Sequence, residues 1–279
     1  MITAVIRLMR LYYTVPIAAG LPVIITYVTA GNLAPVRMDV LLATLSLGFV
    51  IAGTYVLNDV CDVQTDSINR PARVFVGRAV SRRIALVWTV VLFLFGLIAA
   101  AFCNGQFLAI MIGVCLLAVF YNVFSKRIGL LKAVVVALLM TSLYPLAFAV
   151  ASPVDSPRLN SLLIFPAWLF LSAVAYEMLK DIRDAEGDAA VSARSIARHT
   201  RSAYYLPAAR CVALGAGALC VVPGLLGYCG GIYLAVSLLA AGLMIASTLN
   251  PPGRAIPLIY IHVFLITFGS LADLLVLGP

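Results

Sequence analysis

The chain has 279 residues, of which 63% are hydrophobic and only 11% are charged. Soluble domains carry about 25% charged residues, so this composition excludes a water-covered globule and indicates a protein whose solvent is largely lipid. The formal net charge is +8, but the lysines and arginines are spread through short loops between apolar segments. This distribution favours membrane lipid head groups and an anionic substrate as partners, and it argues against nucleic acid.

Nine apolar runs separated by polar residues, glycine or proline predict nine membrane-spanning helices, since one span needs roughly 20 apolar residues. Helices are expected because lipid offers no hydrogen-bond partner to an unpaired backbone amide. The predicted spans are 8–30, 37–58, 82–102, 106–124, 130–150, 160–180, 203–226, 228–249 and 255–278. We therefore predict an all-α transmembrane bundle in which residues 1–279 form a single integral-membrane domain and the first hydrophobic segment is retained.

The distribution of basic residues predicts how this bundle lies in the membrane. With nine spans, seventeen of the 19 lysines and arginines fall on one side, and only Arg37 and Arg158 fall on the other. The positive-inside rule then places the N-terminus in the cytoplasm and the C-terminus on the opposite side. Three polar loops, 58–83, 121–132 and 181–201, share the cytoplasmic side, where we expect any chemistry to occur.

Six of the eleven acidic residues form two clusters with the same spacing, D-x2-D-x3-D, each at the cytoplasmic end of a predicted helix. The clusters are Asp59, Asp62 and Asp66, and Asp181, Asp184 and Asp188. The shared spacing indicates an internal repeat, with two related half-bundles around one central cavity. Asp273, by contrast, lies deep in the last predicted span and has no evident partner in the sequence.

Spacings of three and four residues place the carboxylates of each cluster on one face of a helix, where like charges repel. An aspartate near the bilayer centre costs about 2.5–3.5 kcal/mol on insertion scales, so such a stripe requires a neutralising cation. Grouped carboxylates favour Mg²⁺, which shares its shell with substrate phosphates, and Mn²⁺ is the alternative metal. Asn58 adds an amide oxygen beside the first cluster.

Basic residues beside the clusters complete the pattern of a metal-bound diphosphate, in which metal ions take some oxygens and Arg or Lys take the others. The apolar bundle can hold a long lipid tail and keep water from an allylic cation. Glu177 lies one turn before Asp181. The residues expected to bind substrate are Asn58, Arg70, Arg73, Glu177, Lys180 and Arg183, and those expected to act in catalysis are Asp59, Asp62, Asp181, Asp184, Tyr121 and Lys126.

These motifs closely resemble those of the UbiA-type family of intramembrane prenyltransferases. The family's first signature resembles the stretch from Asn58 to Asp66, its second matches Asp181 to Asp188, and its tyrosine-and-lysine loop resembles Tyr121 to Lys126. The resemblance implies that both aspartate clusters bind Mg²⁺-diphosphate, and that Arg73 and Lys126 contact phosphate. The second motif looks like that of the geranylgeranylglyceryl phosphate and homogentisate branches. One departure is ARVFVGR after Pro71, which lacks the family's second proline and serine.

Several functions fit this pattern. The main hypothesis is transfer of a prenyl group from a polyprenyl diphosphate to a lipid-like or aromatic acceptor, through either a hydroxyl or an electron-rich ring carbon. A membrane terpene cyclase would use the same ionisation chemistry without an acceptor. A cation-coupled transporter would use the acidic helix ends as an ion site, although transport favours acidic groups near the midplane rather than at one side.

Overall fold

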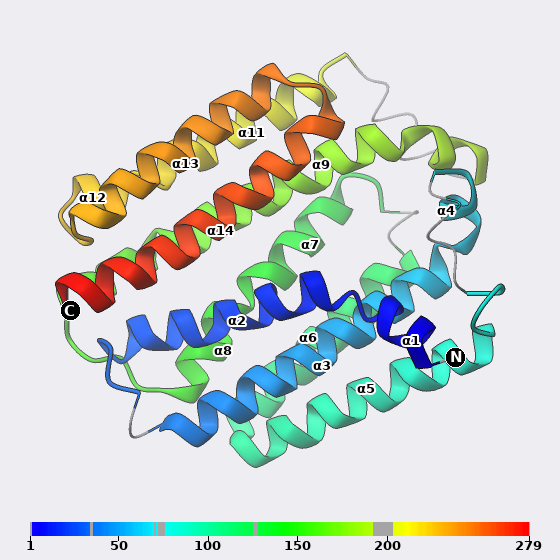
Figure 1. Cartoon of the computed structure of the whole chain (residues 1–279), viewed down its shortest axis with the longest axis horizontal. Helices are drawn as coiled ribbons and strands as arrows, with labels where there is room; N and C mark the ends of the chain where they lie inside the picture. The colour runs from blue at the N-terminus through cyan, green and yellow to red at the C-terminus, as the bar shows by residue number, and fades with distance from the viewer. Residues whose placement is uncertain are drawn as a thin grey trace.

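The structure is a computed structural model that describes residues 2–33, 36–69, 71, 76–124, 128–191 and 203–278, without the side chains of Ile2, Val5 and residues 186–191. Regular structure within these ranges is helical, apart from a single bridge between Val76 and Val80. By length and composition, nine segments of the described chain can cross a membrane, so the predicted multi-pass helical bundle is confirmed. Figure 1 shows the N-terminus and the C-terminus at opposite ends of this bundle.

The spans fall into two sets of four, followed by a ninth helix. The first set is α2 (Leu11–Val28), α3 (Arg37–Cys61), α5 (Arg82–Cys103) and α6 (Gly105–Phe124). The second set is α7 (Leu131–Thr141) with α8 (Leu143–Val150), the 3₁₀ helix η3 (Pro157–Leu163) with α9 (Phe165–Val191), α11 (Tyr205–Leu219) with α12 (Val222–Leu225), and α13 (Gly231–Leu249). The ninth helix is α14 (Pro252–Leu277).

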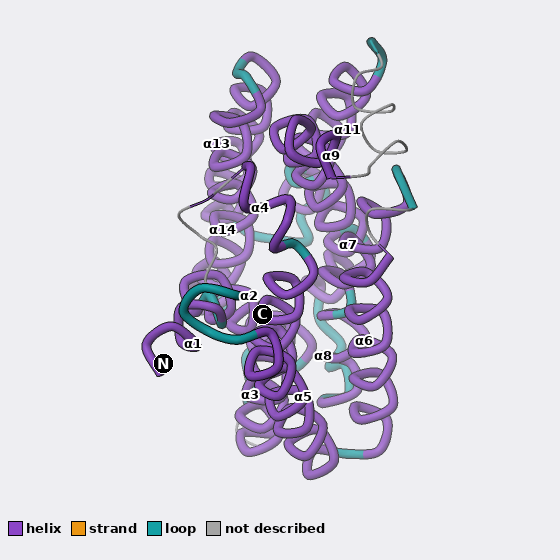
Figure 2. The backbone as a smooth tube through the Cα atoms, turned by 90° about the vertical axis from the view of Figure 1, so that its right-hand side faces the viewer, coloured by secondary structure: helices purple, strands orange, loops and turns teal. Residues whose placement is uncertain are grey.

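The two sets repeat one another in order and in length. From Asp59 to Asp181 the offset is 122 residues, and the same offset carries Arg82, the first residue of α5, to Tyr204, the residue before α11. In Figures 1 and 2, α9, α11, α13 and α14 gather on one side of the molecule, and α3, α5, α6 and α8 gather on the other. These spatial groups match the two sets only in part, because α8 belongs to the second set but packs against α2, α3 and α6 of the first.

Two short helices, α1 (Ile2–Leu8) and α4 (Val63–Asn69), were not predicted, because neither is long enough to give a hydropathy signal. The first aspartate cluster also differs from the expected single helical face. The backbone leaves helical geometry at Asp62, between α3 and α4, whereas α9 runs unbroken through the second cluster. Aspartate favours such breaks because its side chain bonds to nearby groups, and here Asp62 accepts a hydrogen bond from Asn58 at 2.8 Å.

The predicted span 130–150 is divided at Ser142 into α7 and α8. Pro145 explains the division, since it has no N–H to donate to the carbonyl of Thr141 and its ring crowds that carbonyl. Such a break is tolerated in a membrane where the freed groups find partners, and the hydroxyls of Thr141 and Ser142 bond to backbone carbonyls of their own turn.

Small residues allow close helix contacts in the first half-bundle. A side chain at Gly96 on α5 would lie 2.7 Å from Val50 and 3.0 Å from the carbonyl oxygen of Ser46, both on α3. The hydroxyl of Ser46 donates to the carbonyl of Gly96 at 2.7 Å. Close backbone approach with an interhelical hydrogen bond is the usual way in which membrane helices adhere, because lipid gives no hydrophobic drive between them.

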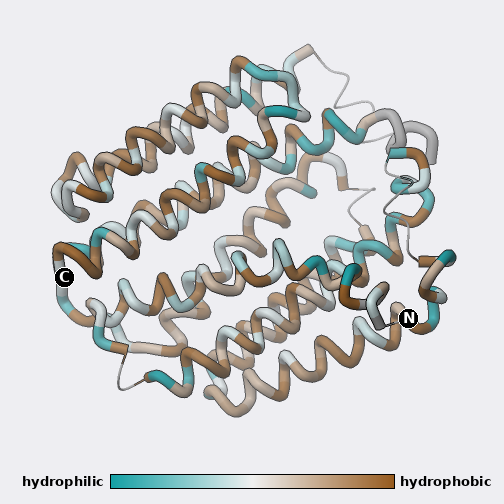
Figure 3. Tube along the Cα trace, in the orientation of Figure 1, coloured by the Kyte–Doolittle hydropathy of each residue, from teal (hydrophilic) through white to brown (hydrophobic). Residues whose placement is uncertain are grey.

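Hydrophilic residues concentrate at the end of the bundle that holds α4 and the C-terminal part of α9, and the middle of the bundle is apolar (Figure 3). Both aspartate motifs lie at this end, which we call the motif end. The opposite end, near the C-terminus, carries a different polar group, centred on the fully buried carboxylate of Asp273.

Asp273 of α14 forms an ion pair with Arg158 of η3 and accepts backbone hydrogen bonds from Gly230 and Tyr233 at 2.7 and 2.9 Å. Arg158 also donates to the carbonyl of Gly278 at 2.7 Å. This network joins η3, the start of α13 and the end of α14, and it supplies the partner that the sequence did not reveal. It lies far from the motifs and therefore has a structural role.

We expect Asp273→Ala to lower the free energy of unfolding by about 3–5 kcal/mol, because it leaves a buried arginine without its counter-ion. Thermal unfolding in detergent measures the effect. Asp155→Ala, which removes an exposed carboxylate from the loop before η3, is the matched control and should leave the melting temperature unchanged. Removing both charges, in Arg158→Met with Asp273→Ala, should recover part of the loss. Equal melting temperatures for Asp273→Ala and the wild type would contradict this role.

Candidate active site at the motif end

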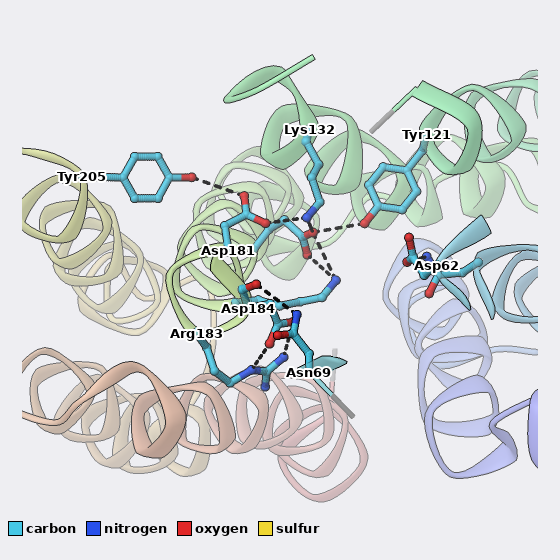
Figure 4. Close-up of polar contacts among 11 residues, drawn as sticks. Asp62, Asn69, Tyr121, Lys132, Asp181, Arg183, Asp184 and Tyr205 are labelled. Atoms are coloured by element: carbon cyan, nitrogen blue, oxygen red, sulfur yellow. Dashed lines mark hydrogen bonds and ion pairs between the residues drawn. The ribbon is translucent and has the colours of Figure 1, made fainter. Parts of the chain in front are cut away.

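The two aspartate motifs lie side by side, although 122 residues separate them in the chain. Helix α4 packs against α9, and the side-chain amide of Asn69 donates to the backbone carbonyl of Asp184 at 3.0 Å. Figure 4 shows Asn69 beside Asp184, with Asp62 entering the same region from the opposite side. The site is thus built where the two half-bundles meet, as the repeated spacing predicted.

In the first motif, Asp59 forms an ion pair with Arg10, the residue just before α2. The guanidinium of Arg10 also lies over the ring of Tyr55, 5.2 Å from its centroid, in a cation–π arrangement. Burial works against the charge, but Asp59 and neighbouring tyrosines outweigh it, so the pKa of Arg10 is raised above its ordinary value. Arg10 therefore stays positively charged beside Asp59 of the first motif.

In the second motif, Asp181 is only 2% exposed and its two oxygens have different partners. One oxygen pairs with the ammonium of Lys132, in the first turn of α7, and the other accepts from the hydroxyl of Tyr205 at 3.3 Å. Lys132 is a further cation brought to the motif by a neighbouring helix. Figure 4 shows Lys132 and Tyr205 reaching Asp181 from two sides.

Glu177 is the centre of a buried charge network beside the second motif and is 1% exposed. Its carboxylate lies 3.0 Å from the ammonium of Lys132 and 3.1 Å from that of Lys180. It also accepts a hydrogen bond of 3.1 Å from the hydroxyl of Tyr121 on α6. Two carboxylates, Glu177 and Asp181, thereby compensate two ammonium groups, which is how charges persist at low dielectric.

Asp184 is more accessible than Asp181, with 19% of its side chain exposed, and it accepts two hydrogen bonds from Arg183 at 2.7 and 2.9 Å. This bidentate pair of neighbouring residues is partly solvated, so either group is free to turn toward a ligand at little cost. Asp66, on α4, is half-buried. Asp62, Asp66 and Asp184 thus have intermediate exposure, as Asp59 does.

Part of the predicted site lies outside the described residues, namely Arg70, Arg73 and Lys126, together with the side chain of Asp188. The sequence analysis also missed four residues that contact the motifs: Arg10, Tyr55, Lys132 and Tyr205. Arg10 and Lys132 had been counted only as topology determinants. Both lie at the start of a span on the motif side, and that position is the one signal that could have identified them.

The described carboxylates fit a metal that shares its shell with substrate, rather than one held by protein alone. Among the described residues, no three histidines, cysteines or acids lie close enough together to hold a metal ion unaided. The donors present are hard oxygens on facing helices, and cations stand beside them. Mg²⁺ is commonly bound through one or two carboxylates plus substrate phosphates, so this donor set suits a metal–diphosphate complex.

An apolar pocket lies further along the bundle toward the opposite end. It is a small cavity of about 40 Å³ that is partly open to the surroundings. Its wall includes Gly20 of α2, Tyr144 of α8, and Trp168 and Leu169 of α9. Trp168 is held in place because its indole N–H donates to His262 at 2.7 Å. Leu169 precedes Asp181 by twelve residues on one helix, which corresponds to about 18 Å at 1.5 Å per residue.

Comparison with known proteins agrees with this geometry. Residues 16–250 match the model of the UbiA prenyltransferase family. Digeranylgeranylglyceryl phosphate synthase of Methanoculleus marisnigri is 36% identical over 196 residues, which cover 70% of this chain and 67% of that protein. The enzymes of the same name from Methanoregula boonei and Methanopyrus kandleri are 35% and 31% identical, over 65% and 84% of this chain and 63% and 84% of their own lengths.

Solved structures share the fold. One, described as digeranylgeranylglyceryl phosphate synthase, has a TM-score of 0.73 at 19% identity and covers 98% of both chains. A UbiA homologue from Archaeoglobus fulgidus bound to GPP and Mg²⁺ has a TM-score of 0.65 at 17% identity, over 95% of this chain and 98% of that one. The chain therefore belongs to the UbiA prenyltransferase family and is an integral-membrane prenyltransferase.

We expect Glu177→Gln to lower both stability and turnover, because it removes one of the two carboxylates that compensate Lys132 and Lys180. Turnover should fall roughly tenfold, equivalent to about 1.4 kcal/mol in the activation barrier. Thermal unfolding in detergent and diphosphate release measure the two effects. Glu177→Asp keeps the charge with a shorter reach and should lie between the wild type and the glutamine variant. A glutamine variant with wild-type stability and rate would show that the network is dispensable.

Proposed function

We propose that the protein transfers a prenyl group from a polyprenyl diphosphate to the hydroxyl of a glyceryl phosphate lipid, with Mg²⁺ as the metal. The observation that carries this proposal is the meeting of the two motifs, where Asn69, three residues after the first motif on α4, donates to the backbone carbonyl of Asp184 in the second. The relatives named digeranylgeranylglyceryl phosphate synthase support the acceptor class, and the Archaeoglobus homologue with GPP and Mg²⁺ supports the donor class.

The proposed roles follow from position and charge. The two aspartate motifs, Asp59, Asp62 and Asp66 with Asp181, Asp184 and Asp188, form the proposed metal site, with the later positions of each motif as the metal ligands, and Asn58 supports the first motif. Bound Mg²⁺ would neutralise the charge that develops on the leaving diphosphate. Lys180 and Arg183 flank the site, and Arg70, Arg73 and Lys126 are proposed as further diphosphate ligands. Tyr121 is held by Glu177 at the edge of the site.

The apolar pocket is the proposed place for the tail of the donor. A diphosphate at the motifs and a tail reaching Leu169 would span about 18 Å of the bundle. Apolar and aromatic walls exclude water, which protects an allylic cation from hydrolysis. The pocket is lined on one side by Gly20, where no side chain limits the available space.

We infer that the motif end faces the cytoplasm. The basic residues support this orientation, because seventeen of the 19 lysines and arginines belong to the motif side of the predicted topology. The N-terminus would then be cytoplasmic and the C-terminus would lie on the opposite side.

Diphosphate release from the purified protein in detergent tests the function. We expect release from geranylgeranyl diphosphate that requires Mg²⁺, stops with EDTA, and rises when a geranylgeranylglyceryl phosphate acceptor is added. Asp62→Ala and Asp184→Ala should reduce it at least a hundredfold, or about 2.7 kcal/mol, whereas Asp155→Ala should not. A cyclic product without acceptor would indicate a terpene cyclase, and a prenylated aromatic ring would change the acceptor class. Ion flux without release, abolished by Asp62→Ala, would indicate a transporter.

Filling the pocket tests where the tail lies. The Cβ of a residue at Gly20 would make only ordinary contact with Leu143, at 3.6 Å, so Gly20→Ala should fold, and the longer side chain of Gly20→Leu would extend into the pocket. We expect this variant to lose activity with geranylgeranyl diphosphate and to keep it with shorter donors. Gly113→Leu is the matched control, because Gly113 is a helical glycine with no neighbour within 4 Å. Equal loss with all donor lengths would place the tail elsewhere.

A further inference from the structure

The first aspartates of the two motifs share an arrangement that the other motif positions do not. Asp59 pairs with Arg10, and Asp181 pairs with Lys132. Both pairs have the same separation along the chain, 49 residues. Arg10 and Lys132 are therefore equivalent positions of the internal repeat, just before α2 and in the first turn of α7. The repeat conserves a buried base as well as an acidic motif.

The equivalence extends to a third position in each half. The same offset of 122 residues relates Tyr55 to Glu177, one helical turn before the first aspartate of each motif. Arg10 lies over the ring of Tyr55, and Lys132 lies 3.0 Å from the carboxylate of Glu177. Each base is thus fixed by two groups of the motif helix, although the chemistry of the second group differs.

The first aspartates are less exposed than Asp184, although only Asp181 is fully buried. Side-chain exposure is 12% for Asp59 and 2% for Asp181, compared with 19% for Asp184. Both oxygens of Asp181 already have partners, Lys132 and Tyr205. A divalent metal at Asp59 or Asp181 would stand directly beside a buried cation, where like charges interact strongly.

We propose that Asp59 and Asp181 are positioning residues and not metal ligands: each neutralises the base of the preceding span and thereby fixes that span against its motif helix. The ion pair with Asp59 supports an unusual backbone conformation at Arg10. Arg10 is left-handed (φ 46°, ψ 52°) at the turn between α1 and α2. A non-glycine residue in that conformation costs about 1–2 kcal/mol and needs support from its surroundings. The inference rests on the proposed function, since the metal and diphosphate belong to the later motif positions.

Metal affinity measured apart from turnover tests the assignment. Mn²⁺ is titrated by electron paramagnetic resonance into the full-length protein with an unreactive prenyl thiolodiphosphate. We expect Asp59→Asn and Asp181→Asn to bind Mn²⁺ within about threefold of the wild type, whereas Asp62→Asn and Asp184→Asn lose at least tenfold. Asp59→Asn and Asp181→Asn should instead lower the melting temperature. Asp59→Asn decides the test by itself if Asp181→Asn does not fold.

A double variant and a repeat-matched control sharpen the result. Arg10→Gln with Asp59→Asn should melt no lower than either single variant, because the two groups act as one pair. Arg254 follows Lys132 by the same 122 residues but is exposed at the start of α14 and forms no ion pair with the described part of the chain, so Arg254→Gln should change neither Mn²⁺ affinity nor melting temperature. If Asp59→Asn lost Mn²⁺ affinity as Asp62→Asn does, the assignment would be overturned. If the wild type bound no Mn²⁺, the proposed function itself would fail.

Discussion

The structure depends on the cost of placing ionised groups in a lipid-embedded bundle. A single charge removed from water costs several kcal/mol even after relaxation, and a counter-ion with good geometry is needed to offset it. The described buried carboxylates meet this condition in every case: Asp59, Glu177 and Asp181 at the motif end, and Asp273 at the other. Arg10, Lys132 and Arg158 each belong to a different element from the acids they pair with, so these pairs also determine which elements meet, whereas Lys180 pairs with Glu177 within α9.

The motif end contains two kinds of charged residue: those held in buried ion pairs between elements, and those in partly exposed pairs. Arg10, Lys132 and the buried acids are fully engaged and hold the helices together. Asp184 and Arg183 form a partly exposed pair, so exchange of this contact for a metal or a phosphate oxygen costs little. Under the proposed function, a diphosphate would meet buried acids that already have counter-ions and a more exposed pair that can exchange its contacts, which is the preorganisation that leaving-group stabilisation requires.

Much of this arrangement was predictable from the sequence, for identifiable reasons. Lipid imposes helices of known length, so hydropathy alone located the nine spans, and the repeated aspartate spacing located the site. The motif break at Asp62 and the short helix α4 were missed because they depend on local side-chain bonding rather than on hydropathy. Arg10 and Lys132 were missed for another reason. Their partners lie 49 residues away, and no local pattern reveals a contact at that distance.

The repeat of four spans has a consequence for how such a site can arise. A unit with an even number of crossings returns the chain to the side from which it started, so a second copy in tandem has the same orientation as the first. Two copies of one acidic helix end then lie on one membrane face without further change. A unit of three or five crossings would have placed the second motif on the opposite face. A composite site made from equivalent halves therefore requires a unit with an even number of spans. The ninth helix makes the total odd, which leaves the two termini on different sides.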